Sequence, residues 1–239
     1  MKKVLIPTKL DTVAAKTLEA NGNYKVIQDA KTPLEALASA HPDAYALIVR
    51  SEPVTAAVID RLPGLKVIVR AGAGFDTIDT KHARKRGVDV MNTPGANANA
   101  VAEEVIALLL ADMRFIVPAD ASTRAGQWEK KAFMGSELAG KTVGIVGLGN
   151  IGRLVARRLR GFDCRLLGYD PLVPGERARE AGIEPVDLDE LFSESDIVTL
   201  HIPETEATRK LVGPRLLALM KTGARIVNCA RAGIVDEEA

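Results

Sequence analysis

The sequence has little cysteine, few aromatic residues and almost no net charge. Only two cysteines, Cys164 and Cys229, occur among 239 residues. Two cysteines cannot form a disulfide framework, so we expect a reducing compartment and a cytoplasmic protein. Lysine and arginine total 32 against 31 acidic residues, a formal charge of +1, which provides no long-range field to attract nucleic acid or an anionic membrane. Aromatic residues make up 4%, so the core must be aliphatic.

Long hydrophobic runs and metal-ligand spacings are missing too. The apolar run over residues 105–111 is far shorter than the roughly 20 residues that a membrane-spanning helix needs. At the N-terminus, only three apolar residues precede Pro7, which is too short for a signal peptide. The sequence has no HxxxH pattern and no paired cysteines, so we expect no metal site. These absences predict a soluble protein that is not exported.

Short β-branched segments alternate with helical stretches from the first residue onward. Five segments are expected to be strands: residues 3–7, 24–28, 45–49, 65–69 and 88–91. Several of them are apolar throughout, as strands buried on both faces are. The alternation predicts an α/β fold, with helices covering a parallel sheet.

A boundary between two domains is expected near residue 96. The segment over residues 92–97 is rich in turn-forming residues, and a helical pattern over residues 99–113 follows it. A second series of strands and helices begins at Lys141 and continues to Ala239. We therefore expect a second α/β domain after the boundary.

The strongest local motif is a glycine-rich turn after the apolar segment at residues 142–146. Gly147 is expected to allow a tight turn, Gly149 to let a pyrophosphate approach the backbone, and Gly152 to let the next helix pack closely on the strand. The N-terminus of that helix offers free amides and partial positive charge to phosphates. The alternative is a glycine cluster that serves only the turn.

A carboxylate at the end of the next apolar segment strengthens the nucleotide-binding interpretation. Asp170 lies 18 residues after Gly152, where dinucleotide-binding folds place the residue that binds the ribose hydroxyls. Its charge would repel a 2′-phosphate, so the pattern predicts NAD rather than NADP.

Two later strand ends carry further candidates, because ligands of open parallel sheets collect beyond the carboxyl ends of the strands. Arg231 has a planar guanidinium that suits the carboxylate and neighbouring oxygen of a 2-hydroxy or 2-oxo acid. The alternative for Arg231 is an ion pair with Asp236 or Glu237. His201 could be an acid–base group, a cofactor contact or a buried hydrogen-bonded ring, and the residues alone favour the buried ring.

Taken together, these residues resemble the D-2-hydroxyacid dehydrogenase family and, within it, the phosphoglycerate dehydrogenase branch. The resemblance covers essentially the whole chain and rests on the order and spacing of many motifs. They include Val49-Arg50-Ser51, Arg70-Ala71-Gly72-Ala73-Gly74, Met91-Asn92-Thr93-Pro94, Ala102-Glu103-Glu104, Gly126-Gln127-Trp128, the glycine turn, Tyr169-Asp170-Pro171, His201 with Pro203 and Thr208, and Asn228-Cys229-Ala230-Arg231.

The resemblance implies a fold, an activity and an assembly. It implies a flavodoxin-like substrate-binding domain over residues 1–96 and a Rossmann NAD-binding domain over residues 97–239, which would form a homodimer. The implied reaction is the NAD-dependent oxidation of the small 2-hydroxy acid D-3-phosphoglycerate to 3-phosphooxypyruvate, in serine biosynthesis. The family's acid–base histidine, its supporting glutamate and the last Rossmann strands would lie beyond residue 239. We therefore expect a fragment of a longer enzyme, able to bind NAD but with little or no turnover.

Site residues follow from the resemblance in three groups. Arg231 is the implied catalytic residue, which orients the substrate's carboxylate and carbonyl. The implied cofactor-binding residues are Gly147, Gly149, Asn150, Ile151, Gly152, Asp170, His201, Pro203, Thr208, Cys229 and Ala230. The implied substrate-binding residues are Arg50, Ser51, Arg70, Gly72, Ala73, Gly74 and Asn97. Among these, Arg50 and Arg70 resemble the phosphate contacts of the phosphoglycerate branch.

Three positions depart from the family's pattern. Glu52 stands where relatives often have a small neutral residue, and its carboxylate would repel a phosphate unless it points away. Thr77 replaces an asparagine, and Ala232 replaces a glycine, which costs energy if φ is positive there. Two alternatives stay open, the second because the family's acid–base pair would lie beyond residue 239. One is another enzyme of the same family, such as a glyoxylate/hydroxypyruvate or D-lactate reductase, and the other is a non-catalytic NAD-sensing protein similar to transcriptional corepressors.

Overall fold

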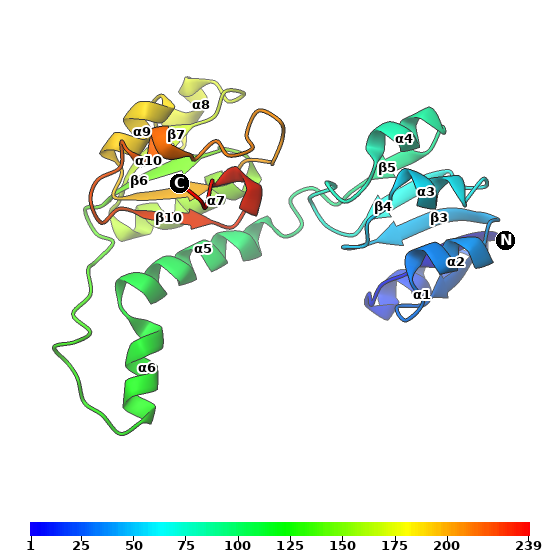
Figure 1. Cartoon of the computed structure of the whole chain (residues 1–239), viewed down its shortest axis with the longest axis horizontal. Coiled ribbons are helices and arrows are strands. Elements are labelled where there is room, and N and C mark those ends of the chain that lie inside the picture. The colour runs from blue at the N-terminus through cyan, green and yellow to red at the C-terminus, as the bar shows by residue number, and fades with distance from the viewer. The chain divides into compact units, whose positions relative to one another are not determined.

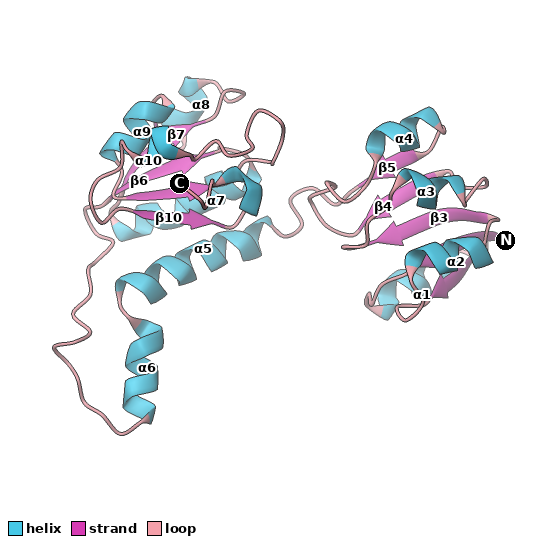
Figure 2. Cartoon of the chain, viewed as in Figure 1, coloured by secondary structure: helices cyan, strands magenta, loops and turns pink.

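A computed structural model describes residues 1–239, and the chain divides into two compact units, Met1–Asn97 and Ala98–Ala239. Each unit contains one five-stranded sheet whose paired strands are all parallel, with helices beside it (Figures 1 and 2). The predicted α/β class is therefore confirmed. No helix combines the length and apolar character needed to cross a bilayer.

The first unit has the strand order β2-β1-β3-β4-β5, which is the order of flavodoxin-like folds. Its strands are β1 (Lys2–Ile6), β2 (Tyr24–Gln28), β3 (Ala44–Val49), β4 (Val67–Arg70) and β5 (Asp89–Met91). Its helices are α1 (Thr12–Ala20), α2 (Leu34–Ala40), α3 (Ala56–Asp60) and α4 (Thr80–Lys85). All five predicted strands are present, with small differences at their ends.

Both faces of this first sheet are packed, which explains why its strands are apolar throughout. Successive residues of a strand point to opposite faces. In β1, Leu5 therefore packs with Leu47 and with residues of α2, α3 and α4, whereas Val4 and Ile6 pack with Leu18 of α1. The packing holds the loops after β3 and β4 at the carboxyl edge of the sheet.

The second unit has the strand order β10-β9-β6-β7-β8. With β6 numbered as strand 1 and the sheet read from β8 to β10, this is the Rossmann order 3-2-1-4-5. Its strands are β6 (Thr142–Val146), β7 (Arg165–Tyr169), β8 (Glu184–Pro185), β9 (Ile197–Leu200) and β10 (Arg225–Asn228). Its helices are α5 (Ala98–Met113), α6 (Ile116–Arg124), α7 (Asn150–Leu159), α8 (Gly175–Glu180), α9 (Leu188–Glu194) and α10 (Pro214–Leu217), with short 3₁₀ turns η1 (Arg160–Phe162) and η2 (Ala232–Ile234).

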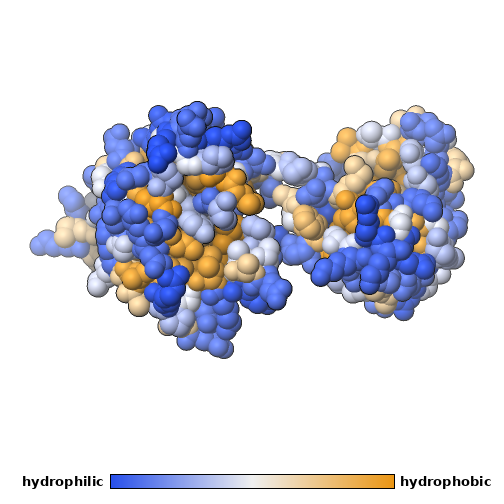
Figure 3. All heavy atoms as spheres, turned by 90° about the horizontal axis from the view of Figure 1, so that it is seen from above, coloured by the Kyte–Doolittle hydropathy of each residue, from blue (hydrophilic) through white to orange (hydrophobic).

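Helix α5 packs against this second sheet through one narrow stripe. Ala102, Val105, Leu109 and Met113 are all buried, and their spacing of three and four residues places them on one helical face. They share a hydrophobic core with Val143 and other residues of the sheet. Hydrophobic areas also reach the surface of both units, where hydrophilic residues surround them on the face seen in Figure 3.

Candidate functional site

The glycine turn links β6 to α7 and has a geometry that only glycine permits at two positions. Gly147 has φ +96°, and a Cβ there would lie 2.6 Å from the carbonyl oxygen of His201. A Cβ at Gly152 would overlap the carbonyl oxygen of Gly147, so α7 approaches the end of β6 closely. Gly149 differs, because a Cβ there would meet no atom within 4 Å. The turn is therefore open toward solvent at Gly149 and closed behind it.

Asp170 lies beside this turn, at the end of β7. Its Oδ2 accepts the backbone N–H of Leu148 at 2.8 Å, and its Oδ1 accepts the backbone N–H of Leu172 at 2.8 Å. Because each carboxylate oxygen has two acceptor positions, the group keeps capacity for two further hydrogen bonds. The backbone bonds hold the carboxylate against the glycine turn.

These features suit the diphosphate and ribose of a dinucleotide. Asn150, Ile151 and Gly152 form the first turn of α7, where backbone N–H groups have no partner within the helix and the helix dipole is positive. The open side of Gly149 leaves room for a phosphate to reach these amides. Asp170 would then hold the ribose through its remaining acceptor positions. The donor set therefore fits NAD.

His201 begins the loop after β9, and its ring is enclosed. Its backbone N–H donates to the Val146 carbonyl at 2.7 Å, and Nε2 lies 2.9 Å from Oγ1 of Thr199. Nδ1 is buried and has no hydrogen-bond partner. Burial lowers the pKa of His201 from 6.5 to about 4. The imidazole is consequently neutral at neutral pH, and the expectation of a buried hydrogen-bonded ring agrees with this environment.

The remainder of that loop is closed by a threonine. The Thr208 hydroxyl donates to the Pro203 carbonyl at 2.6 Å and accepts the Thr205 N–H at 2.8 Å. Pro203 and Thr208 are therefore brought together with His201 at the carboxyl edge of the second sheet. This edge also holds the glycine turn, since β6 and β9 are neighbouring parallel strands.

Arg231 follows β10 at the same edge. Its Nη1 donates to the carbonyl of Ala230 at 2.8 Å. Asn228 anchors the loop by donating Nδ2 to the Arg231 carbonyl at 2.8 Å and accepting the Ala230 N–H at 3.1 Å. Asp236, one of the alternative partners considered for Arg231, pairs with Lys210 at 3.0 Å. Sequence reasoning assigned no role to Asn228, although an asparagine at a strand end is a common turn-stabilising residue.

Two further residues of this region have local environments that bear on the site. Ala232 lies in η2 and is not among the residues with positive φ, so the substitution of glycine by alanine causes no backbone strain there. Burial and the nearby charge of Glu104 raise the pKa of the half-buried Cys229 thiol, so this side chain stays a protonated thiol at neutral pH.

The first unit gathers the expected substrate-binding residues at the carboxyl edge of its own sheet. Arg50 and Ser51 follow β3, and Arg70 ends β4. Nε of Arg70 donates to the Arg50 carbonyl at 2.9 Å, which ties the two strand ends together. The Arg70 guanidinium lies over Gly72, where a Cβ would overlap it. The side chain of Arg70 therefore lies directly against the backbone of Gly72.

An asparagine that sequence reasoning did not assign supports the Gly72–Gly74 loop. Nδ2 of Asn92 donates to the Ala73 carbonyl at 2.6 Å, and the Thr93 N–H donates to the Gly72 carbonyl at 3.0 Å. The loop after β4 is thus fastened to the segment after β5. Asn97 lies apart from these contacts, immediately before α5, and is exposed.

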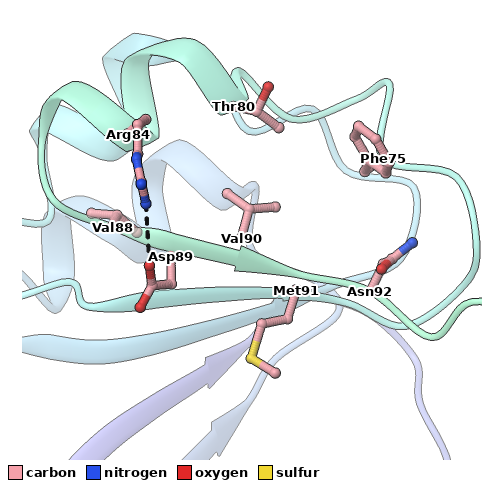
Figure 4. A pocket seen from close by; sticks show the side chains of 8 residues that line it. All are labelled: Phe75, Thr80, Arg84, Val88, Asp89, Val90, Met91 and Asn92. Atoms are coloured by element: carbon pink, nitrogen blue, oxygen red, sulfur yellow. Dashed lines mark ion pairs between the residues drawn. The ribbon is translucent and has the colours of Figure 1, made fainter.

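A cavity of about 380 Å³ lies near this loop, between α4 and β5. Its wall is mainly apolar, with Phe75 and Asn92 at one end and the Arg84–Asp89 ion pair, at 4.0 Å, at the other (Figure 4). Ligand sites usually combine an apolar wall with several converging polar groups, and the polar side chains here are separated along the groove. We assign this cavity no role.

The fold and the glycine turn define a class of protein, the Rossmann-type dinucleotide-binding proteins. The family model of the D-isomer specific 2-hydroxyacid dehydrogenase, NAD binding domain, matches residues 106–239. The chain therefore belongs to the D-isomer specific 2-hydroxyacid dehydrogenase family, and its second unit carries that family's NAD-binding domain.

Similar proteins span several activities of this family. A D-3-phosphoglycerate dehydrogenase from Methanocaldococcus jannaschii is 44% identical over 241 residues, covering 100% of the chain and 46% of the relative. A hydroxypyruvate reductase from Thermotoga maritima is 48% identical over 199 residues, covering 83% and 64%. The crystal structure of a glyoxylate reductase from Paecilomyes thermophila matches with a TM-score of 0.90 at 30% identity, covering 100% and 76%. The chain spans less than two thirds of the length of these two curated relatives.

Proposed function

We propose that this chain forms the substrate-binding and NAD-binding parts of an NAD-dependent D-3-phosphoglycerate dehydrogenase. The proposed reaction oxidises D-3-phosphoglycerate to 3-phosphooxypyruvate, in serine biosynthesis. One observation carries the proposal. The hydrogen bond from Arg70 to the Arg50 carbonyl brings two arginines to one edge of the first sheet, which gives the positive charge that a phosphate requires. The similarity to two D-3-phosphoglycerate dehydrogenases, which covers 100% and 99% of this chain and 46% and 45% of those relatives, supports it.

The roles of the cofactor-binding residues follow from their positions in the second unit. NAD, when bound, accepts the hydride from the substrate carbon. The amides at the start of α7 bind its diphosphate and Asp170 its ribose, while His201, Pro203, Thr208, Cys229 and Ala230 line the site at the carboxyl edge. His201 positions this loop, because its backbone N–H donates to the Val146 carbonyl and its ring Nε2 lies 2.9 Å from the Thr199 hydroxyl.

Positively charged and polar residues are assigned to the two negatively charged ends of the substrate, its carboxylate and its phosphate. Arg231 orients the carboxylate and the reacting oxygen. The loop over residues 72–74 binds the carboxylate through the amides of Ala73 and Gly74, because the Gly72 N–H already donates to the Arg70 carbonyl at 2.8 Å. Arg50, Arg70 and the Ser51 hydroxyl bind the phosphate, and Asn97 contributes a further polar contact. A hydrogen bond between a charged donor and a charged acceptor contributes about 1.5–3 kcal/mol. Loss of one arginine is therefore expected to weaken the binding of a phosphorylated substrate about tenfold or more.

A substrate panel with NAD tests the proposal. We would measure NADH formation from D-3-phosphoglycerate, D-glycerate and D-lactate, using the 239-residue chain and a chain extended through the family's acid–base histidine. The extended chain should prefer phosphoglycerate, and the 239-residue chain should bind NAD with little turnover.

Two arginine variants sharpen this panel. Arg50→Ala and Arg70→Ala should raise KM for phosphoglycerate about tenfold or more. KM for the unphosphorylated acids should stay within about twofold of its wild-type value. Arg84→Ala is the matched control, because Arg84 is an exposed arginine of the same unit, paired with Asp89. Equal losses for all acids would contradict phosphate recognition.

A second candidate is a hydroxypyruvate reductase. The carboxylate of Glu52 favours it, because this group lies beside the backbone of Arg50 and adds negative charge where a phosphate would bind. The Thermotoga relative adds weight to it. Hydroxypyruvate reduction faster than phosphoglycerate oxidation in the same panel would favour this candidate. Absence of turnover with every acid, together with tight NAD binding, would favour the NAD-sensing, corepressor-like alternative.

We further propose a homodimer formed through the second unit, in the cytoplasm. Val117, Trp128 and Met134 are 70%, 85% and 77% exposed, and exposed apolar residues of this size favour a protein interface. Analytical ultracentrifugation of the chain and of a Val117→Glu variant tests the dimer. Both cysteines are free thiols, which is compatible with a reducing compartment.

A further inference from the structure

Glu52 folds back onto the end of β3 and occupies backbone donors there. Its Oε2 accepts the N–H of Arg50 at 2.7 Å and the N–H of Ser51 at 3.1 Å. Two successive amides that point to one place form a small anion-binding concavity. In this chain the concavity already contains an anion, which is the protein's own carboxylate.

The carboxylate is ionised and it is held in place. Burial by itself raises the pKa of Glu52, but hydrogen bonds from the Arg50 amide, its own backbone amide, the Thr8 hydroxyl and the Ser51 amide outweigh burial and leave the pKa below its ordinary value. Glu52 is half-buried, whereas Arg50 and Ser51 are exposed. A fixed negative charge therefore lies directly beneath the exposed groups that would face a phosphate.

Arg70 extends the same arrangement. Its Nε donates to the Arg50 carbonyl at 2.9 Å, so the peptide groups around Arg50 are bonded on both sides, by a carboxylate at the amide and a guanidinium at the carbonyl. The amide and the carbonyl of Arg50 are consequently both hydrogen-bonded within the first unit. An incoming phosphate would find the Arg50 side chain and the Ser51 hydroxyl available, but neither of the two amides.

We propose that Glu52 determines substrate charge at this edge: it takes the two amide donors and adds one negative charge, which weakens binding of phosphorylated acids relative to unphosphorylated ones. The proposal rests on the proposed function, since it presumes that this edge receives the distal end of a 2-hydroxy acid. Two like charges that approach closely near a protein surface repel strongly enough to change affinity about tenfold or more.

The test compares ligand binding by the full 239-residue chain and by Glu52→Gln, which removes the charge and keeps an oxygen that can accept the two amides. Glu19→Gln is the matched control, because Glu19 also accepts a backbone N–H in the first unit, from Val26 at 3.3 Å. Isothermal titration in the presence of NADH measures the dissociation constants of D-3-phosphoglycerate and of D-glycerate. Each variant is then compared with the wild-type chain for both ligands.

We expect Glu52→Gln to bind phosphoglycerate about tenfold more tightly than the wild-type chain does. Its dissociation constant for glycerate should stay within about twofold of wild type, and Glu19→Gln should change neither dissociation constant. An equal change for the two ligands, or no gain for phosphoglycerate, overturns the proposal. Glu52→Ala gives the same comparison should the glutamine variant not fold. A chain that prefers an unphosphorylated acid in the substrate panel, yet gains phosphoglycerate affinity in Glu52→Gln, would refute the proposed function and support Glu52's role.

Discussion

Lowering the pH should destabilise the second unit through a single buried ring, that of His201. The pKa of this histidine falls from 6.5 to about 4 on burial, and its Nδ1 has no partner inside the fold. Between these two pH values the unfolded chain binds a proton that the folded chain does not bind. Stability contributed by the neutral ring is therefore complete above pH 6.5 and is lost as the pH falls toward 4.

The size of the effect follows from the two pKa values. Each pH unit in this window is worth about 1.4 kcal/mol. At pH 4.5 the unfolded histidine is almost fully protonated, while the folded one is protonated in only a minor fraction of molecules. The difference destabilises the fold by about 2.5 kcal/mol relative to neutral pH. That amount is a large part of the roughly 5–15 kcal/mol that stabilises an ordinary domain.

Urea denaturation of the wild-type chain and of His201→Gln, followed by circular dichroism from pH 8 to pH 4.5, measures this loss. Glutamine keeps a polar partner for Thr199 and does not titrate. The difference in unfolding free energy between the two proteins should be constant from pH 8 to pH 7 and should shift by about 2.5 kcal/mol, in favour of the variant, by pH 4.5. Carboxylates with lowered pKa values, such as Asp196, are common to both proteins and cancel. Parallel stability curves across this window would refute the assigned burial.

Two further predictions concern the same unit. Gly147→Ala should lower the unfolding free energy by about 1–3 kcal/mol, because φ at this residue is +96° and the new Cβ would meet the His201 carbonyl. Gly149→Ala should keep the unfolding free energy within about 0.5 kcal/mol of wild type and weaken NAD binding in a fluorescence titration. Equal stability losses for the two variants would contradict the turn geometry. Asp196→Ala should cost about 1–3 kcal/mol in urea denaturation, since it leaves the Thr142 N–H, which donates to Asp196 at 2.8 Å, without its acceptor, and an unchanged midpoint would show that this bond contributes nothing.

Much of the architecture was predictable because its causes are local. The apolar segments that became β3 and β4 were identified from their composition alone, since strands buried on both faces must be apolar throughout. The three glycines of the turn were assigned separate roles, and φ at Gly147 together with the close approach at Gly152 agree with those roles. Such features depend on a few neighbouring residues, so the sequence contains them directly.

The side-chain contacts at the strand ends were less predictable. Asp170 was expected to face a ribose, and its hydrogen bond from the Leu148 N–H of the glycine turn was not foreseen. The direction of the Glu52 carboxylate was an open question, and the fold turns it onto the amides of Arg50 and Ser51. The roles of Asn228 and Asn92 as loop anchors were not foreseen, because their partners are carbonyl groups positioned by the packing of the sheets.

By itself, the sequence determined the order of strands and helices, the glycine turn and the family, since each depends on residue type and spacing along the chain. Tertiary structure alone decided that the His201 ring loses its solvent and stays neutral, and that Ala232 escapes positive φ. It also decided that Glu52 binds two amides of its own loop. Burial, backbone angles and hydrogen-bond partners at these positions depend on groups brought together across the sheet edge, and no local pattern encodes that approach.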